Sequence, residues 1–330
     1  MKTVKVAIIG LGKMGLLHAS ILKTMPNVEI ISLCDKSSVL RKICKKLFKY
    51  AQVVDDIEKL AGLDINTVYV ATPIPGHFPI VNAILSENIA KNVFVEKTLT
   101  SNWDKSIHLC ELASKTQGSN MVGYMKRFAV TFSKAKNLLD QNVLGDLVSF
   151  EAYAFSSDFS NFPTSSKSKS RGGVLSDLGS HVIDLALWFF GDFNVESALS
   201  KSVDNIVAED SVEFKVKKIG IDGTFHVSWC MDNYRMPNFG LSITGSAGTI
   251  KVNDYSLELK LKNGESRTWF KHDLNDYVRF LLGESEYYRE DEAFVNSILN
   301  DNKVEPSFLT ASKVDNVIDN VRKEVSTNEV

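Results

Sequence analysis

Runs of apolar residues separated by polar stretches divide the chain into two parts with different patterns. In the first part the runs are short and nearly continuous, as in Val4–Ile9 (VKVAII), and they recur at 30–34, 52–54, 67–71 and 93–95. Such runs are typical of parallel strands that are buried on both faces. Helix-like stretches alternate with them, and this alternation predicts a doubly wound parallel sheet.

From about Tyr124 onward, apolar and polar positions alternate in short runs bounded by turns, which is the pattern of antiparallel strands. These runs lie at 148–155, 211–216, 221–229, 239–244, 249–252 and 257–261, and helical patterns follow at 275–282, 290–299 and 310–321. We therefore expect an α/β protein of two domains. A doubly wound parallel domain would cover 1–123, and an α+β domain with a mainly antiparallel sheet would cover 124–330.

Composition and charge restrict the partners. The 330 residues are 44% hydrophobic and 24% charged, with a net charge of −2. This balance gives no general attraction to nucleic acid or to an anionic membrane, so the expected partners are small molecules and protein chains. The longest apolar helical stretch, 178–190, is too short to cross a bilayer, and the first residues lack a secretory signal pattern. We expect a cytoplasmic protein.

The four cysteines are widely spaced and form no CxxC pair. Cysteines in this pattern are typical of reduced thiols rather than of disulfides or metal ligands. We therefore predict neither a disulfide nor a metal site at Cys34, Cys44, Cys110 and Cys230.

The first chemical motif follows the first strand directly, as Gly10-Leu11-Gly12-Lys13-Met14-Gly15, and an amphipathic helical pattern follows it. Gly10 permits a tight turn, Gly12 leaves room for a pyrophosphate beside the backbone amides, and Gly15 lets the helix approach the strand. This order predicts dinucleotide binding, with the helix N-terminus at Lys13 and Met14 facing the phosphates. The alternative is a glycine turn in some other α/β fold.

Asp35 ends the second strand about twenty residues beyond the glycines, where a carboxylate would meet the adenosine ribose hydroxyls. The alternative is that Asp35 only caps the following helix. A carboxylate here would repel a 2′-phosphate and favours NAD, whereas the nearby Lys36 and Arg41 would attract one. NAD is therefore expected, with NADP as the alternative.

Polar residues also follow two later strands, at the sheet edge where ligands of open α/β sheets bind. Thr72, Pro73 and His77 follow the fourth strand, and Glu96 and Lys97 follow the fifth. His77 is either a residue of the cofactor site or a helix-start residue without chemistry.

Another polar group lies on an apolar helical stretch. Asp177, His181 and Asp184 are spaced i, i+4 and i+7, so a helix places them on one face, which is costly in a core unless they line a site. The alternative is a structural histidine with capping aspartates. Just upstream lies a basic strip, Lys167, Lys169 and Arg171. This strip would either clamp a phosphate or a nucleotide-sugar diphosphate, or be a solvated loop.

Together the motifs GLGKMG, ATPIPGH, VEKT and GGVLSDLGSHVIDL, with Asp35, resemble the glucose-fructose oxidoreductase and inositol dehydrogenase family over about residues 6–184. The resemblance implies a Rossmann domain followed by a domain whose large open sheet forms the interface of a homodimer or homotetramer. At the end of the basic strip, Arg171 is the predicted substrate contact. The resemblance also implies reversible hydride transfer at a sugar or cyclitol carbon, with catalytic roles for Lys97, Asp177 and His181. The cofactor site would then include Thr72, Pro73, His77 and Glu96.

The sequence departs from the family pattern at three places. Thr98 stands where the family has proline after Glu96-Lys97, and a non-proline cis bond costs about 3 kcal/mol, so we do not expect a cis peptide beside Lys97. Residues 88–92 form a longer approach to the fifth strand than is common. Val130 stands near the place where the family continues the Lys126-Arg127-Phe128 run to proline.

These observations predict an NAD(P)-dependent dehydrogenase acting on a secondary alcohol of a sugar, nucleotide sugar or inositol. His181 would take the hydroxyl proton, because an ordinary imidazole has a pKa of about 6.5. Asp177 would orient that imidazole, and Lys97 would hydrogen-bond the substrate oxygen. The nicotinamide accepts the hydride, so no metal is needed. The alternative is a non-catalytic dinucleotide- or sugar-sensing protein of the same fold.

Overall fold

The computed structural model describes residues 2–158, 171–201, 209–274, 276–278 and 284–328. The chain forms two compact units. The first unit comprises residues 1–125 and 278–315, and the second comprises 126–277 and 316–330. The helix expected over 275–282 lies largely outside the described residues, as do Lys167 and Lys169 of the basic strip.

The first unit is built on a parallel sheet of 6 strands in the order β3-β2-β1-β4-β5-β6. The strands are β1 (Val4–Ile9), β2 (Val28–Cys34), β3 (Gln52–Val54), β4 (Thr67–Val70), β5 (Asn92–Glu96) and β6 (Asn120–Gly123). The strand order reverses between β1 and β4, and ligands of such sheets bind at the carboxyl edge of this point. The predicted doubly wound sheet is confirmed.

Helices connect these strands: α1 (Lys13–Leu22), α2 (Ser38–Leu47), α3 (His77–Ser86) and α4 (Trp103–Ser114). Side chains cap two of them, because Ser37 accepts from the Leu40 amide at the start of α2 and Asn102 accepts from the Lys105 amide at the start of α4. Shorter 3-10 turns lie at η1 (Ile57–Leu60), η2 (Ile74–Gly76), η3 (Met125–Phe128) and η5 (Lys271–Asp273).

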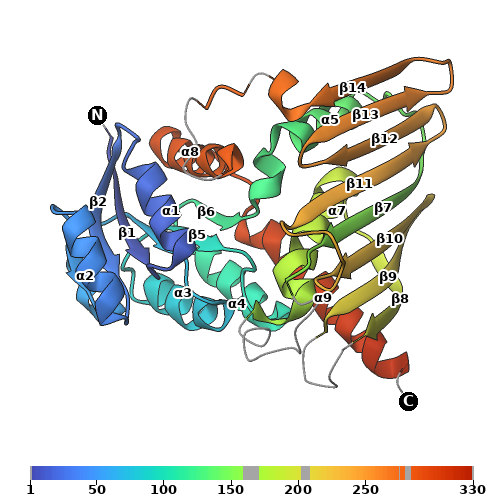
Figure 1. Cartoon of the computed structure of the whole chain (residues 1–330). Helices are drawn as coiled ribbons and strands as arrows, with labels where there is room; N and C mark the ends of the chain where they lie inside the picture. Colours follow the sequence, from blue (N-terminus) through green and yellow to red (C-terminus); the bar gives the residue numbers. More distant parts are fainter. Residues whose placement is uncertain (1, 159–170, 202–208, 275, 279–283, 329–330) are drawn as a thin grey trace. The chain divides into compact units, whose positions relative to one another are not determined.

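The first unit is completed by a helix from far along the chain, α8 (Ser285–Asn300), which contacts α1 and β1 (Figure 1). Phe294 of α8 packs on two fully buried rings of the sheet, Tyr69 and Phe94, with ring centroids 5.7 Å apart in each case. A division at residue 123 alone therefore does not describe the units, since residues 278–315 cluster with the first. The next helix, α9 (Phe308–Asn328), begins in the first unit and ends in the second.

The second unit contains a sheet of 8 strands in the order β14-β13-β12-β11-β7-β10-β9-β8. The β7 and β10 strands run parallel and the other neighbours run antiparallel, which confirms the mainly antiparallel sheet. The strands are β7 (Leu147–Phe155), β8 (Asn194–Lys201), β9 (Ser211–Lys218), β10 (Ile221–Ser228), β11 (Asn238–Gly245), β12 (Gly248–Asn253), β13 (Ser256–Leu261) and β14 (Ser266–Phe270).

Alternation gives this sheet one buried and one polar face. In β9, Val212, Phe214 and Val216 are buried while the residues between them are exposed. The buried face packs against α5 (Val130–Asp140), α7 (Ser180–Phe190) and the π-helical segment η4 (Leu175–Gly179) that leads into α7 (Figure 1). Within the described residues, no helix has both the length and the apolar composition needed to span a membrane.

Candidate functional site

The glycine turn joins β1 to α1 at the carboxyl edge of the first sheet. Gly10 has φ +90°, and a Cβ on it would lie 2.7 Å from the Ala71 carbonyl carbon, whereas a Cβ on Gly15 would lie 1.8 Å from the Gly10 oxygen. Those two positions accept only glycine for reasons of packing. Gly12 is different, because a Cβ there meets nothing within 4 Å. Gly12 is also the N-cap of α1, and it has no side chain to accept hydrogen bonds from the first helix amides. The amides of Lys13 and Met14 therefore border the open space at Gly12, which is the arrangement that a pyrophosphate requires.

Asp35 is fixed beside this turn. Its Oδ2 accepts from the Leu11 amide at 2.7 Å, and its Oδ1 accepts from the Ser37 amide at 2.7 Å. The helix cap itself is Ser37, so Asp35 links the glycine turn to the start of α2 rather than serving as the N-cap. A carboxylate held in this way is suited to a pair of ribose hydroxyls.

Basic residues near Asp35 differ in their availability to a 2′-phosphate. The Arg41 guanidinium donates to the backbone oxygens of Asp35 at 2.8 Å and of Lys36 at 2.7 Å, so it is already engaged by carbonyls. Lys36 is exposed. The arrangement favours NAD over NADP, because the carboxylate faces the turn and the guanidinium is turned to the backbone.

His77 joins two strand ends. Its Nδ1 lies 2.7 Å from the Thr98 carbonyl oxygen and its Nε2 lies 2.7 Å from the Thr72 carbonyl oxygen. Burial lowers the pKa of His77, although both carbonyls oppose this shift, so the neutral ring donates through one nitrogen. His77 therefore lies between the turn containing Thr72 and Pro73 and the segment after Lys97, and its one N–H donates to one of the two carbonyls.

Lys97 follows β5 and is half-buried. Its amide donates to Oε2 of Glu96 at 3.2 Å, and Oε1 of Glu96 accepts from Nε2 of His18 at 2.9 Å. Both oxygens of the buried Glu96 carboxylate therefore have partners within the protein, and its predicted cofactor contact stays a prediction. The Lys97–Thr98 peptide is cis, so our expectation that the loss of proline excludes a cis bond is wrong. Hydrogen bonds to His77 and Thr100 hold Thr98 on the far side of that bond.

The second unit carries Asp177 and His181. Asp177 lies in the π-helical η4 and His181 in the first turn of α7. Asp177 accepts from Nη1 of Arg171 at 3.2 Å, and the same nitrogen donates to Asp158 at 2.7 Å. The His181 ring is 4% exposed and lies edge-on to the Phe239 ring, with centroids 5.1 Å apart. Arg171 is therefore placed to act on Asp177, and Phe239 fixes the imidazole plane.

Two buried cations beside this group were not assigned a role from the sequence. Arg127 pairs with Asp184, which explains the third member of the polar row on α7 as a structural partner. Lys126 lies 2.5 Å from Asp254 and 4.9 Å from the Phe239 ring centroid, so it backs the ring that contacts His181. The Lys126-Arg127-Phe128 run was the only signal for them, and it gave no partner.

Comparisons with known proteins decide the family. The model of the "Oxidoreductase family, NAD-binding Rossmann fold" (GFO/IDH/MocA) matches residues 4–124, and the model of the GFO/IDH/MocA C-terminal domain matches residues 132–251. The chain belongs to the GFO/IDH/MocA family. This confirms the resemblance inferred from the motifs, and it places the protein among NAD-dependent oxidoreductases, the enzyme class and cofactor that the sequence predicted.

Several relatives of this GFO/IDH/MocA protein are named as dehydrogenases. An inositol 2-dehydrogenase of Rhizobium meliloti is 21% identical over 313 residues, which cover 92% of each chain. A scyllo-inositol 2-dehydrogenase (NAD(+)) of Bacillus subtilis is 27% identical over 190 residues, covering 57% of this chain and 54% of the relative. A solved levoglucosan dehydrogenase in complex with NADH and L-sorbose has a similar fold, with a TM-score of 0.87 at 19% identity, covering 99% of this chain and 98% of that one.

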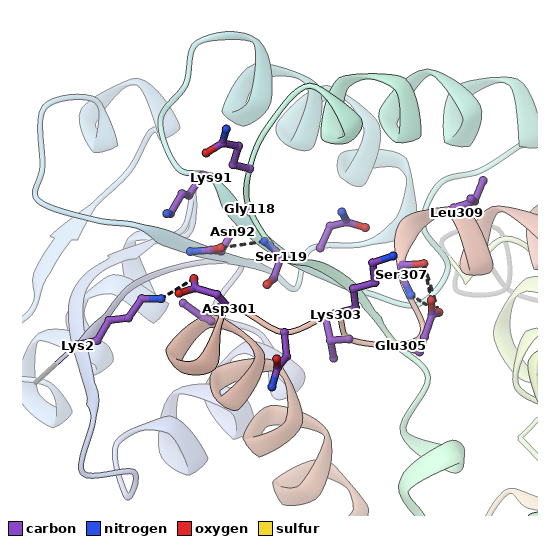
Figure 2. Close-up of a pocket in the computed structure, with 15 residues that line it drawn as sticks. Lys2, Lys91, Asn92, Gly118, Ser119, Asp301, Lys303, Glu305, Ser307 and Leu309 are labelled. Carbon is purple, nitrogen blue, oxygen red and sulfur yellow. Dashed lines mark hydrogen bonds and ion pairs between the residues drawn. The ribbon is translucent and has the colours of Figure 1, made fainter.

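A cavity of about 470 Å³ lies elsewhere on the first unit of this GFO/IDH/MocA protein (Figure 2). It is lined at the amino ends of β5 and β6 by Asn92 and Asn120 and by the loop after α8, where Lys2 pairs with Asp301. The glycine turn follows β1 and Lys97 follows β5, so both lie at the carboxyl edge of this parallel sheet and the cavity at its amino edge is not the cofactor site. Within the described residues, no cluster of three or more His, Cys, Asp or Glu side chains could hold a metal ion.

Proposed function

We propose that the protein oxidises a secondary alcohol of a sugar or cyclitol to the ketone, and catalyses the reverse reduction, with NAD as the cofactor. The observation that carries this proposal is the space at Gly12 beside a fixed Asp35, on a chain of the GFO/IDH/MocA family that keeps Lys97, Asp177 and His181. The named relatives act on inositols or were solved with sugar ligands, which supports the substrate class.

The cofactor would be held by Gly10, Gly12 and Gly15 through the turn, by the α1 amides of Lys13 and Met14, and by Asp35. Thr72, Pro73 and His77 would border it from the β4 end. Bound NAD supplies the acceptor for the hydride that leaves the substrate carbon.

The residues of the chain handle the proton and the charge. As the C–H hydrogen leaves with its electron pair, His181 takes the hydroxyl proton on an imidazole nitrogen, and the carbon–oxygen bond becomes a carbonyl. The Lys97 ammonium donates a hydrogen bond to the same oxygen and stabilises its developing negative charge. Asp177 stabilises the protonated imidazole, and Arg171 holds Asp177 in place. Reduction of the ketone reverses each transfer.

The test is NAD reduction followed by absorbance against a panel of cyclitols, hexoses, sugar phosphates and UDP-hexoses. With the best substrate, Lys97→Ala and His181→Ala each lose at least about 100-fold in kcat, as expected for loss of an acid/base or charge-stabilising group. Lys45→Ala, at an exposed position of α2, serves as the control. Near wild-type turnover in both variants rejects the residue roles. NAD binding without turnover on the whole panel favours the sensor alternative.

We also propose an assembly and a location for the protein. We infer a homodimer or homotetramer from the family resemblance, to be measured by light scattering after size-exclusion chromatography. We place the protein in the cytoplasm because its four cysteines, all among the described residues, form no disulfide, and two of them, Cys34 and Cys44, are buried.

A further inference from the structure

A buried ion cluster lies beneath the carboxyl edge of the first sheet. His18 on α1 is fully buried, and its Nδ1 lies 2.8 and 3.0 Å from the two carboxylate oxygens of Asp291 on α8. Its Nε2 lies 2.9 Å from Glu96 at the end of β5. Both ring nitrogens face carboxylate oxygens, an arrangement suited to an imidazolium ion that donates from both nitrogens.

The surroundings keep that charge in place. Three aromatic rings surround the imidazole, with centroid-to-centroid distances of 5.6 Å for Tyr69, 5.1 Å for Phe94 and 6.4 Å for Tyr287. Burial alone disfavours the charged ring, but Asp291 and Glu96 outweigh it and raise the pKa of His18 well above its ordinary 6.5. The titratable groups around the cluster are Glu96 of β5, Tyr69 of β4, and Glu286, Tyr287, Glu290 and Asp291 of α8.

The cluster reaches the backbone of the proposed catalytic lysine. Oε1 of Glu96 accepts from His18, and Oε2 of the same carboxylate accepts from the Lys97 amide at 3.2 Å. A continuous set of hydrogen bonds therefore runs from Asp291 through His18 and Glu96 to the main chain at Lys97. An apolar side chain of similar volume would fill the space of His18 at lower desolvation cost, so packing alone does not account for a cation there.

We propose that His18 is a positioning residue. Held by Asp291, it orients the Glu96 carboxylate so that this carboxylate accepts from the Lys97 amide, and the hydrogen bond fixes the backbone that carries the Lys97 side chain. The kinetic consequence of this proposal rests on the function proposed for Lys97, but the geometric consequence does not. The Lys97 amide is protected only while His18 holds Glu96, and this protection does not require bound NAD.

The experiment compares the unliganded wild type with two variants, His18→Gln and Asp291→Asn. The Asp291→Asn substitution keeps the size of the side chain and one oxygen acceptor but removes the negative charge. His108→Gln is the matched control, since His108 is exposed on α4, outside the buried cluster, where its Nε2 lies 3.0 Å from the Asn82 side-chain oxygen and its ring lies 5.7 Å from the Phe78 ring. Imidazole ¹⁵N spectra report whether His18 is doubly protonated. Amide hydrogen exchange reports the protection of Lys97, and steady-state kinetics separate kcat from KM for NAD.

We expect wild-type His18 to stay doubly protonated at pH 8, and Lys97 amide exchange to be at least tenfold faster in His18→Gln and faster in Asp291→Asn. In both variants kcat falls about tenfold while KM for NAD stays within twofold, and His108→Gln matches the wild type. If His18→Gln does not fold, the isosteric Asp291→Asn decides the result. A neutral wild-type His18 at pH 8, or unchanged Lys97 exchange in a folded variant, overturns the proposal.

The two proposals fail in different ways. If Lys97→Ala retains turnover, the catalytic role of Lys97 fails, while the ¹⁵N spectra and the exchange rates still decide whether His18 orders the Lys97 backbone. If exchange accelerates but kcat is unchanged in an enzyme that does need Lys97, the positioning role in catalysis is overturned and the function stands.

Discussion

Arg127 and Asp184 form a two-point ion pair in the core of the second unit: Nε of Arg127 donates to Oδ2 at 2.8 Å and Nη2 donates to Oδ1 at 2.7 Å. Asp184 has no exposed surface, and the Arg127 side chain is 7% exposed. The pair anchors α7 to the η3 turn, and its α7 member, Asp184, lies three residues after His181. Asp184 thus holds the helix that carries His181, while its carboxylate oxygens are occupied.

Removal of one partner from this pair destabilises the protein. Asp184→Ala leaves a buried guanidinium without its carboxylate, so we expect the free energy of unfolding to fall by about 3–5 kcal/mol. Chemical denaturation measures it. Lys217→Ala, which removes an exposed cation 3.8 Å from Glu196, is the control and changes the stability little. An equal effect of both substitutions contradicts the assigned role.

The glycines of the turn separate into packing and ligand positions. Gly15→Ala forces a Cβ to 1.8 Å from a backbone oxygen, so it lowers the melting temperature. Gly12→Ala enters open space, so it leaves the melting temperature unchanged but weakens NADH binding at least about tenfold, or roughly 1.4 kcal/mol. Thermal unfolding and NADH fluorescence titration distinguish the two. Unchanged NADH affinity in Gly12→Ala contradicts a phosphate site at this turn.

Asp35 sets the preference for the unphosphorylated ribose. Asp35→Ala removes the carboxylate that two amides orient, so NADH affinity falls about tenfold and NADPH affinity falls less. Asp64→Ala, at an exposed position near the amino edge of the sheet, is the control. Titration with both reduced nucleotides gives the ratio of affinities. A parallel loss for both nucleotides means that Asp35 supports only the turn.

Glu290 links stability to pH. It is fully buried, and burial together with Glu96 raises its pKa well above its ordinary 4.5, with His18 opposing the shift. The folded state therefore retains a proton that the unfolded chain releases above about pH 4.5, and stability is lost as pH rises toward the folded pKa. Glu290→Gln mimics the protonated form and removes this loss. Its free energy of unfolding should rise relative to the wild type, by at most about 1.4 kcal/mol per pH unit.

Urea denaturation at several pH values between 5 and 9 would measure this difference. Glu292→Gln is the control, because Glu292 also lies on α8 but is only half-buried. A difference between Glu290→Gln and the wild type that does not change with pH would mean that Glu290 ionises normally in the folded state.

The sequence predicted the parts of the fold that show strong local patterns. Continuous apolar runs identified the strands of the parallel sheet, and alternation identified most of the antiparallel ones. Both edge strands, β8 and β14, were missed because most of their residues are exposed, so they have no alternation to detect. The π-helical turn at Asp177 was missed because residue spacing alone does not distinguish it from an α-helix.

The candidate site was predictable only where its chemistry is local. Gly12 and Asp35 lie in a motif with a known order of elements; in the structure a Cβ on Gly12 would meet open space and Asp35 accepts from the Leu11 amide, and their cofactor roles stay predictions. The partner of His18 was not predictable, because 273 positions separate it from Asp291 and no periodic pattern connects them. The cis Lys97–Thr98 bond was also not predictable, because Thr98 stands where a proline would have favoured it.

The helix α8 completes the first unit but follows residues 126–277 of the second unit in the chain, so the order of synthesis matters. When a ribosome has translated the 6 strands of the first sheet, the cation at His18 still lacks Asp291, and the rings of Tyr69 and Phe94 still lack Phe294. The nucleotide-binding half therefore cannot mature while the other half is being made. A premature stop before codon 291 would remove one of the two carboxylates that flank His18 and leave Glu96, so truncation would damage the beginning of the protein as much as its end.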